Sequence, residues 1–338
     1  MSWAGDAPGL SLRGKRVWIA GHTGMVGSAL VRRLKREYCD LLLVSHDELD
    51  LRRQHHVERW MRITRPEVVV VAAARVGGIM ANATYPADFL YDNAMIAMNV
   101  LHAAAEIDVE RLLWLGSSCI YPRDAAQPIT ESALLTGKLE PTNEAYSIAK
   151  LAGLKLAEAY ARQFGHRFFT AMPTNLYGPN DNFDPENAHV LPALIRKVDA
   201  ARRQNLPAIT MWGSGKPLRE FLHVDDLADA CIFLLEHYDG TAPVNIGSGQ
   251  EISILDLTRL VADIAGYEGE IISDTSKPDG TPRKRLDTTI LDRLGWRPQM
   301  PLRTGIESVF AAWRESQDDE LSTPPPGRIS AAVAPPPR

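Results

Sequence analysis

The stretch RVWIAGHTGMVGSALVRRLKRE, residues 16–37, decides the fold of this chain. Its opening segment RVWIA predicts a short buried strand, and residues 25–37 predict a helix. Gly21, Gly24 and Gly27 follow the strand in the spacing G-x-x-G-x-x-G. Glycines permit a tight turn and let backbone N–H groups approach a pyrophosphate at the helix N-terminus. The stretch therefore predicts a dinucleotide site, and the alternative is a plain turn that binds no ligand.

The same alternation of strand and helix continues along the chain. Long helical patterns cover residues 86–106 and 144–164. Continuous apolar strands separated by helices are typical of a parallel sheet that is covered on both faces. The pattern therefore predicts the α/β class, with a doubly wound, Rossmann-like parallel sheet. Further strands are expected at 40–44, 67–74, 111–118 and 167–178.

The pattern breaks up after about Pro179, where loops rich in Pro, Asn, Asp and Gly alternate with short helices. We expect a nucleotide domain and a smaller, discontinuous α/β substrate domain, with an appendage at each end. A tail rich in proline and poor in large apolar residues cannot offset its ordering entropy. The expected division is 1–13 as a flexible segment, 14–180 plus 218–250 as the nucleotide domain, 181–217 plus 251–316 as the substrate domain, and 317–338 as a disordered tail.

Composition excludes several classes of function. The 338 residues carry 37 Lys and Arg against 42 Asp and Glu, which gives −5, whereas nucleic-acid binders usually carry a basic excess. No apolar run is long enough for a membrane span, and the N-terminus lacks the apolar core of a signal peptide. Cys39, Cys119 and Cys231 give no disulfide framework and suit a reducing compartment, so the cytoplasm is the expected location.

A second motif, Tyr146-Ser-Ile-Ala-Lys150, places a phenol and an ammonium on one face of the predicted helix. A nearby lysine charge favours the phenolate, so we expect a lowered pKa for Tyr146 and acid or base chemistry near neutral pH. Ser117, at the end of a predicted strand, is expected to hydrogen-bond the same substrate oxygen. Taken alone, the motif is more often an ordinary helix face.

Together, these motifs resemble the extended short-chain dehydrogenase/reductase superfamily. Longer strings narrow the resemblance to the GDP-L-fucose synthase family, and the similarity covers roughly residues 15–316. In the superfamily the tyrosine gives a proton to the carbonyl, the lysine binds the nicotinamide ribose, and the serine orients the carbonyl. The strings are AAARVGGIMANATYPADF (72–89), LGSSCIYP (115–122), EPTNEAYSIAK (140–150), MPTNLYGPNDNF (172–183) and SKPDGTPRKRLD (276–287).

The resemblance implies an enzyme that inverts C3 and C5 of GDP-4-keto-6-deoxy-D-mannose and then reduces C4 with NADPH. A ketone at C4 acidifies the hydrogens on C3 and C5, so each inversion needs a base, an acid and a stabilised enolate oxygen. Cys119 and His189 match the family's acid/base pair, while Ser117, Tyr146 and Lys150 match its reduction set. Without the resemblance, Cys119 would be a buried structural thiol and His189 a cap or packed side chain.

The resemblance also implies which residues bind NADP(H) and the GDP-sugar, and no metal is expected. Cations suit a diphosphate, Trp212 offers a flat surface to guanine or sugar, and Asp279 suits hydrogen bonds from ribose or guanine. The cofactor set is Gly21, His22, Thr23, Gly24, Met25, Val26, Gly27, His46, Asp47, Glu48, Leu49, Asp50, Leu51, Leu115, Gly116, Ser117, Ser118, Lys150, Pro173, Thr174, Asn175, Leu176 and His189, and the GDP-sugar set is Lys197, Trp212, Arg219 and Asp279.

The end of the second strand favours NADP over NAD. No carboxylate stands directly there for a ribose 2′-hydroxyl, whereas Ser45 and His46 suit a 2′-phosphate, with Arg52 or Arg53 nearby. The alternative is that His46 is a solvated loop residue. Some members of the family carry arginine where this chain has Thr23 and His46, which leaves the strength of the NADP preference open. Lys197 also stands where arginine is common; it keeps the charge but loses the bidentate fork, so a slightly lower affinity is expected there.

The expected assembly is a homodimer joined through the helices at 86–106 and 144–164. Two other functions stay open at this level. One is a related epimerase or reductase that acts on another GDP-4-keto sugar, such as a GDP-heptose derivative. The other is a catalytically silent nucleotide-binding protein, against which the joint presence of the five catalytic candidates argues.

Overall fold

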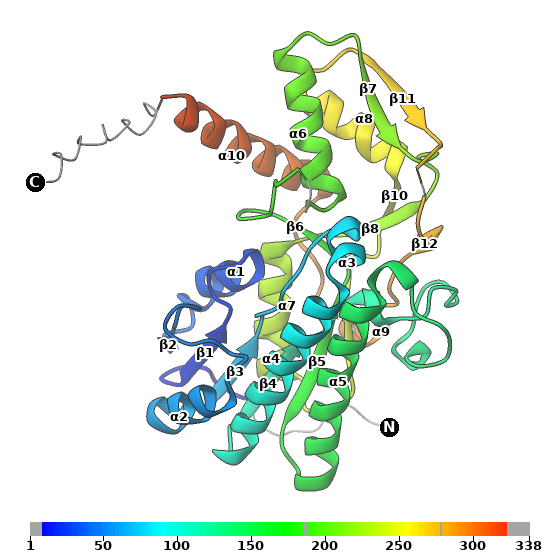
Figure 1. Ribbon diagram of the computed structural model, residues 1–338. Helices are drawn as coiled ribbons and strands as arrows, with labels where there is room; N and C mark the ends of the chain where they lie inside the picture. Colours follow the sequence, from blue (N-terminus) through cyan, green and yellow to red (C-terminus); the bar gives the residue numbers. More distant parts are fainter. Residues whose placement is uncertain (1–8, 186–187, 278, 323–338) are drawn as a thin grey trace, which may run out of the picture.

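The computed structural model describes residues 9–322 apart from 186–187 and 278, and it shows an upper and a lower body (Figure 1). The lower body contains a six-stranded parallel sheet in the order β2-β1-β3-β4-β5-β9. The chain leaves β1 for β2 on one side and returns for β3 on the other, so the switch point for ligand binding lies between β1 and β3. The strands are β1 (Arg16–Ala20), β2 (Asp40–Leu42), β3 (Val68–Val71), β4 (Arg111–Leu115), β5 (Phe168–Pro173) and β9 (Val244–Ile246).

Helices cover both faces of this sheet, which confirms the doubly wound α/β fold (Figure 1). Successive strand residues point to opposite faces, so Val17 and Ile19 pack under α1 and α7, whereas Trp18 packs under α2, α4 and α5. Both sets of side chains are buried, which explains why the strands are continuously apolar. These helices are α1 (Met25–Leu34), α2 (Gln54–Thr64), α4 (Pro86–Glu106), α5 (Glu144–Phe164) and α7 (Val224–His237).

The upper body contains two small sheets and a core of its own. In one sheet β8 pairs with β6, β10 and β12, and in the other β7 pairs with β11. Its core joins Ile195, Leu257 and Phe310 from three helices. The elements are β6 (Asn175–Tyr177), β7 (Ala208–Trp212), β8 (Leu218–His223), β10 (Glu251–Ser253), β11 (Glu270–Asp274), β12 (Arg283–Lys284), α6 (Val190–Arg203), α8 (Ile254–Ala265) and α10 (Leu302–Ser322).

Short helices complete the chain, and the proposed domain boundaries stay a prediction. β6 and β8 fall within the residues expected in the nucleotide domain, yet they pair with strands of the upper body. β9, by contrast, joins the six-stranded sheet beside β5. The short helices are α3 (Ile79–Thr84), α9 (Thr289–Leu294), η1 (Ser118–Ile120), η2 (Glu131–Ala133) and η3 (Pro141–Asn143).

Both ends differ from the expected appendages where the structure describes them. Leu10 and Leu12 are buried in the lower core, and the Leu10 N–H donates to the Glu236 carbonyl at 3.1 Å. Residues 9–13 are therefore packed, because two apolar side chains at this spacing reach the same core. At the other end α10 continues to Ser322, while residues 1–8 and 323–338 lie outside the described part of the chain.

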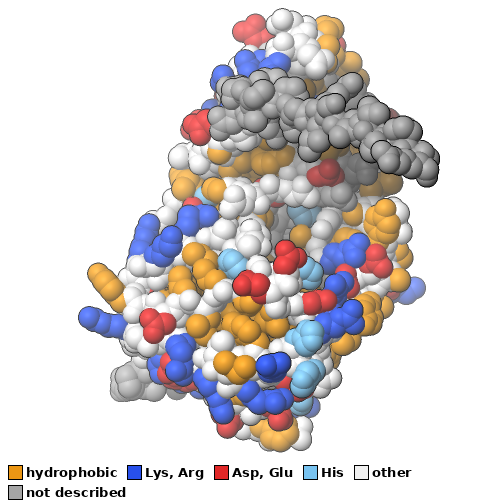
Figure 2. Space-filling view, turned by 60° about the vertical axis from the view of Figure 1, so that its left-hand side comes forward, with side chains coloured by type: hydrophobic (Ala, Val, Ile, Leu, Met, Phe, Trp, Pro, Cys, Tyr) orange, Lys and Arg blue, Asp and Glu red, His pale blue; other side chains and the backbone are white. Residues whose placement is uncertain are grey.

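No described helix combines the length and the apolar composition that crossing a membrane requires. On the face seen in Figure 2, basic side chains alternate with acidic ones and with histidines. The described part of that face therefore carries no continuous basic stripe of the kind that follows a nucleic-acid backbone.

Gly153 sets the distance between α5 and β4. A Cβ atom at this position would lie 2.7 Å from two ring carbons of Trp114. The Trp114 ring is fully buried in a packed core and cannot move aside. The close approach lets Lys150, one turn earlier on α5, donate a hydrogen bond from Nζ to the Leu115 carbonyl at 2.8 Å.

We expect Gly153→Ala to lower the free energy of unfolding by about 1–3 kcal/mol, because the added carbon overpacks the core. Helix propensity alone predicts the opposite sign, a gain of about 1 kcal/mol. Urea unfolding followed by circular dichroism measures the change, and a gain in stability contradicts the packing argument.

Candidate active site

The glycine turn is shaped by close backbone contacts that no side chain would allow. Gly21 has φ +88°, and a Cβ atom there would lie 2.6 Å from the backbone of Ala73 in the loop after β3. A Cβ atom on Gly27 would lie 2.0 Å from the Gly21 carbonyl oxygen. The loops after β1 and β3 therefore meet at the switch point only because these positions are glycine.

The residues around this turn fit a dinucleotide. Gly24 is the N-cap of α1 and offers no side-chain hydrogen bond, so the first N–H groups of the helix are available to a pyrophosphate. The Nδ1 atom of His22 is buried, and it has no hydrogen-bond partner among the described residues. A buried polar atom without a partner, next to a helix N-terminus that no side chain caps, fits a site for a polar ligand.

The arginines expected beside the 2′-phosphate are already engaged. Arg52 donates to Asp50 at 2.9 Å and to Asp92 at 3.2 Å, and Arg53 lies 3.6 Å from Asp50. The hydrogen bonds from Arg52 lower the pKa of Asp50 to about 2. The neighbouring serine is engaged as well, since the Ser45 hydroxyl donates to Glu48 at 2.7 Å. The roles of Ser45, His46 and the two arginines at the 2′-phosphate therefore stay predictions.

The other cofactor candidates lie along the same edge of the sheet. Leu115 ends β4, Pro173 ends β5, and the backbone N–H of Thr174 donates to the Ile246 carbonyl at 3.0 Å. The Asn175 side chain donates to the Glu220 carbonyl at 2.7 Å, which ties β6 to β8. Leu49 and Leu51 differ from the others, since they are buried in the core under α2 and α4. Roles in cofactor binding stay predictions for the whole set.

Cys119 lies on η1, directly after β4, and is held from two sides. Its N–H donates to the Ser117 hydroxyl at 3.2 Å, and its carbonyl accepts a hydrogen bond from the Ser147 hydroxyl at 3.0 Å. Ser147 is the neighbour of Tyr146 on α5, so the fold brings Ser117, Cys119 and Tyr146 together as expected from the sequence.

Lys284 is the site residue that sequence reasoning missed. It ends the two-residue strand β12, and its Nζ lies 3.3 Å from the Cys119 Sγ. Burial alone would raise the pKa of this thiol, but the charge of Lys284, the Ser117 hydroxyl and Arg219 together lower it. Lys284 lies in the string SKPDGTPRKRLD, which carries part of the family resemblance. Nothing within that string distinguishes this lysine from the neighbouring charged residues. A thiol with a lowered pKa is suited to act as a base.

His189 is the N-cap of α6, and its side chain makes no capping hydrogen bond. Its ring reaches solvent, yet protein surrounds it closely enough that burial lowers its pKa, and the charge of Lys284 acts in the same direction. Lys284 therefore acts electrostatically on both members of the expected acid/base pair. The neutral imidazole is the form that these influences favour.

The expected lowering of the Tyr146 pKa is wrong for this structure. Burial raises the pKa of Tyr146, the Cys119 thiolate adds to the rise, and Ser117 opposes it. The Nζ of Lys150 lies 6.0 Å from the Tyr146 ring centroid, and burial lowers the pKa of Lys150 itself to about 7. Tyr146 therefore carries its proton near neutral pH, which suits a proton donor.

The expected GDP-sugar residues cluster on the upper body. Trp212 is 58% exposed at the end of β7, and the ammonium groups of Lys197 and Lys277 lie 6.0 Å and 5.5 Å from the centroid of its ring system. Lys197 also donates to the Thr210 carbonyl at 2.7 Å. Lys277 is a second residue that the sequence reasoning did not single out.

Arg219 and Asp279 connect this cluster to Cys119. The Asp279 carboxylate accepts hydrogen bonds from the Ser214 N–H at 2.6 Å and the Ser214 hydroxyl at 2.8 Å. Arg219 donates to the Leu218 carbonyl at 2.9 Å, and its charge acts on both Asp279 and Cys119. Asp279 therefore ties the loop after β11 to Ser214, and Arg219, on β8 of the upper body, is close enough for its charge to act on the thiol.

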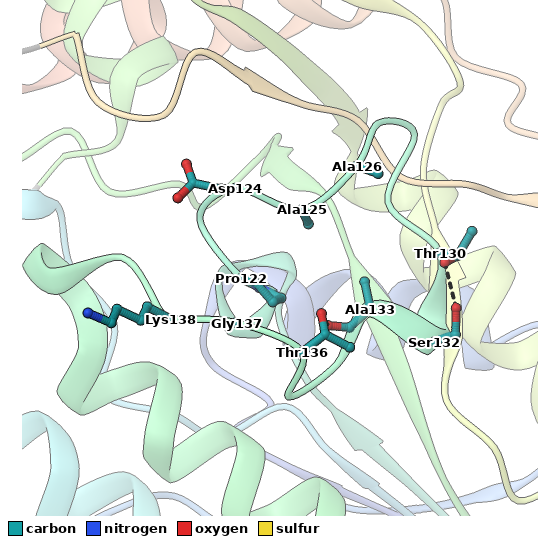
Figure 3. A pocket seen from close by; sticks show the side chains of 10 residues that line it. All are labelled: Pro122, Asp124, Ala125, Ala126, Thr130, Ser132, Ala133, Thr136, Gly137 and Lys138. Atoms are coloured by element: carbon teal, nitrogen blue, oxygen red, sulfur yellow. Dashed lines mark hydrogen bonds between the residues drawn. The ribbon is translucent and has the colours of Figure 1, made fainter.

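Cavity size is a poor guide to the chemistry here. A small cavity of about 50 Å³ is lined by Cys119, Asn143 and Lys284. A larger hollow of about 500 Å³ lies in the 122–138 loop and includes no expected site residue (Figure 3). The described residues also contain no group of three or more His, Cys, Asp or Glu side chains suited to a metal ion. The smaller cavity is the one that contains expected site residues, and Cys119 as its catalytic group stays a prediction.

Comparison with known proteins agrees with this geometry. The profile of the NAD dependent epimerase/dehydratase family matches residues 17–247, and the chain belongs to that family. Within it, the chain is 53% identical over 302 residues to the GDP-L-fucose synthase of Sinorhizobium fredii, covering 89% of this chain and 96% of that protein.

Solved structures extend the comparison. A GDP-L-fucose synthetase from Naegleria fowleri bound to NADP has a TM-score of 0.84 at 28% identity, covering 93% of this chain and 98% of that one. The GDP-mannoheptose C4 reductase MlghC from Campylobacter jejuni with NADP bound has a TM-score of 0.82 at 34% identity, covering 90% and 100%.

We expect Lys284→Met to raise the pKa of the Cys119 thiol by about 1–3 units, because an adjacent cation favours the thiolate. The variant should then alkylate more slowly at neutral pH, with its rate profile moved to higher pH. Iodoacetamide labelling across pH, read at Cys119 by mass spectrometry, measures the midpoint. Lys155→Met, which removes a surface lysine paired with Glu158, is the control. Equal profiles for the two variants contradict the assignment.

Proposed function

We propose that the protein acts as a GDP-L-fucose synthase. It inverts C3 and C5 of GDP-4-keto-6-deoxy-D-mannose and then reduces the C4 ketone with NADPH to give GDP-L-fucose. The observation that carries the proposal is the thiol of Cys119, which lies next to Lys284 and beside the Ser117 and Tyr146 reduction set. The relatives at 53% identity support the same activity.

Epimerisation uses the acid/base pair. Cys119 as thiolate takes the proton of C3 or C5 onto its sulfur, and the C–H electron pair moves into the enolate. The imidazolium form of His189, which its lowered pKa makes a stronger acid, gives a proton to the opposite face and is left neutral. The hydroxyl groups of Ser117 and Tyr146 hold the enolate oxygen during this step. His189 supplies the second proton-transfer group, and Lys284 favours the charged form of Cys119.

Reduction uses the protonated phenol. Tyr146 donates its proton to the C4 oxygen, and Ser117 orients that oxygen. When bound, NADPH supplies the hydride for C4. Lys150, buried and held on the Leu115 carbonyl, binds the nicotinamide ribose and becomes fully charged when the ligand gives it polar partners. The glycine turn from Gly21 to Gly27 holds the pyrophosphate.

The GDP-sugar occupies the cluster on the upper body. Arg219 and Lys197 bind the diphosphate, because cations on partly buried stems form strong charge-assisted hydrogen bonds. Trp212 stacks on guanine or the sugar. Lys277 adds a positive charge over the Trp212 ring. A GDP-heptose derivative is the second candidate substrate, favoured by the likeness to MlghC.

The protein, incubated in D2O with GDP-4-keto-6-deoxy-D-mannose and NADPH, is expected to give GDP-L-fucose that carries deuterium at C3 and C5. NADPH oxidation at 340 nm and NMR of the product measure both half-reactions. Cys119→Ser should lose about 100-fold or more of the exchange, because general base catalysis contributes 10²–10⁴, while NADPH binding is retained. Cys39→Ser, a half-buried thiol away from the site, is the control.

Three outcomes would overturn parts of this proposal. Oxidation of NADPH without deuterium means a plain reductase, and the roles of Cys119 and His189 fail. Turnover of a GDP-4-keto-heptose but not of the 6-deoxy sugar moves the function to the second candidate. Binding of NADPH with no turnover of either sugar means a silent binding protein.

The assembly that we propose is a homodimer joined through α4 and α5. These helices lie side by side (Figure 1), and their outer surface exposes Leu90, Tyr91 and Ile148, with Tyr85 at the N-cap of α4. Large apolar side chains gathered on two neighbouring helices are suited to burial against a second copy, where each becomes part of a shared core.

Tyr91→Asp is expected to convert the dimer to a monomer, because it places a charge in the apolar interface. Light scattering during size-exclusion chromatography gives the mass. Tyr38→Asp replaces a more exposed tyrosine away from these helices and should leave the mass unchanged. A monomeric wild-type protein, or a dimeric Tyr91→Asp variant, argues against this interface.

A further inference from the structure

The contact between Cys119 and Lys284 joins two segments that hold little structure of their own. Cys119 lies on a three-residue 3-10 helix, and Lys284 ends a strand of two residues. Short elements of this kind cannot fix a side chain by their own hydrogen bonds. A separation of 3.3 Å between Nζ and Sγ therefore depends on what both segments are anchored to.

Asn245 is the anchor that the two segments share. It lies in the middle of β9, paired in register with Met172 of β5, and it is 0% exposed. Its Oδ1 accepts a hydrogen bond from the Tyr121 hydroxyl at 2.6 Å, two residues after Cys119. Its Nδ2 donates to the Asp287 carbonyl at 3.0 Å, three residues after Lys284. One side chain of the central sheet thus bonds to both segments.

The same amide also holds the loop that separates the two segments. Nδ2 donates a second hydrogen bond to the Ile129 carbonyl at 2.9 Å, and the Asn245 N–H donates to the Glu131 carboxylate at 2.9 Å. The N–H of Asp287 in turn donates to the Ile129 carbonyl at 2.8 Å. Both amide protons are therefore used, and no other side chain offers this donor and acceptor pattern at the same size.

We propose that Asn245 and Tyr121 are positioning residues for epimerisation, which hold the Cys119 segment and the Lys284 segment at a fixed separation. The inference rests on the proposed function, since it concerns how the base of that reaction is kept charged. Asn245 and Tyr121 do not contact the reacting carbons, and both act through Cys119. Thiolate and ammonium interact strongly only at close range, so a small drift of either segment weakens the base.

Tyr121→Phe is the most conservative test, because it removes one hydroxyl and keeps the ring. We expect deuterium uptake at C3 and C5 of GDP-4-keto-6-deoxy-D-mannose, measured with NADP⁺ in D2O, to slow about tenfold. Small misplacements of reacting groups lower a reaction rate by about one to two orders of magnitude. The alkylation profile of Cys119 should move to higher pH. The charged and titratable groups that act on the thiol are Lys284, Arg219 and Tyr146, and Tyr121→Phe alters none of them directly.

The matched control is Tyr267→Phe, which removes a phenol hydrogen bond to the Leu206 carbonyl in the upper core. It should match the wild type in exchange rate and alkylation profile even where it lowers stability. Asn245→Ala is a second variant, expected to slow exchange at least as much as Tyr121→Phe with NADPH affinity unchanged. If Tyr121→Phe behaves like Tyr267→Phe in both readouts, the inference fails. If the wild type itself takes up no deuterium, the proposed function fails instead.

Discussion

A parallel sheet places the carboxyl ends of its strands at one edge, and the chemistry of this protein depends on that constraint. The glycine turn follows β1, the loop of Ala73 follows β3, and Ser117 and Cys119 follow β4. Because β1 and β3 flank the switch point, their loops meet without side chains between them. The loop after β4 therefore positions Ser117 and Cys119 at this edge, where Tyr146 reaches them from α5 and Lys284 from β12.

The surroundings of the site shift the pKa values of two neighbouring groups in opposite directions, raising that of Tyr146 and lowering that of Cys119. Burial keeps the proton on Tyr146 and lowers the pKa of Lys150 to about 7. Beside them, Lys284, Ser117 and Arg219 together outweigh the effect of burial on the Cys119 pKa and favour its thiolate. Environments that push pKa values apart suit neighbouring groups to different roles, which in the proposed reaction are a proton donor for the ketone and a base for the adjacent carbons.

The sequence was sufficient for elements with a long, regular pattern. The helices at 86–106 and 144–164 form α4 and α5 with the same bounds, since many periodic positions define them. Short strands such as β12 were not foreseen, because two residues carry no periodicity and their pairing with β8 comes from the tertiary fold. Lys284 was missed for the same reason: its partner Cys119 lies far away in the chain. The pKa of Tyr146 was misjudged because burial outweighs a lysine that lies one helical turn away.

The location of β12 has a consequence for how such a protein changes over evolutionary time. Ser117, Tyr146 and Lys150 belong to the six-stranded sheet and its helix, whereas Lys284 comes from the small sheet of the upper body. The ketone-reducing set and the charge that activates the thiol are thus encoded in separate stretches of the gene. Under the proposed function, substitutions in the segment that carries β12 would silence the inversions while the reduction persists, so descendants of this architecture would lose one chemistry without losing the other.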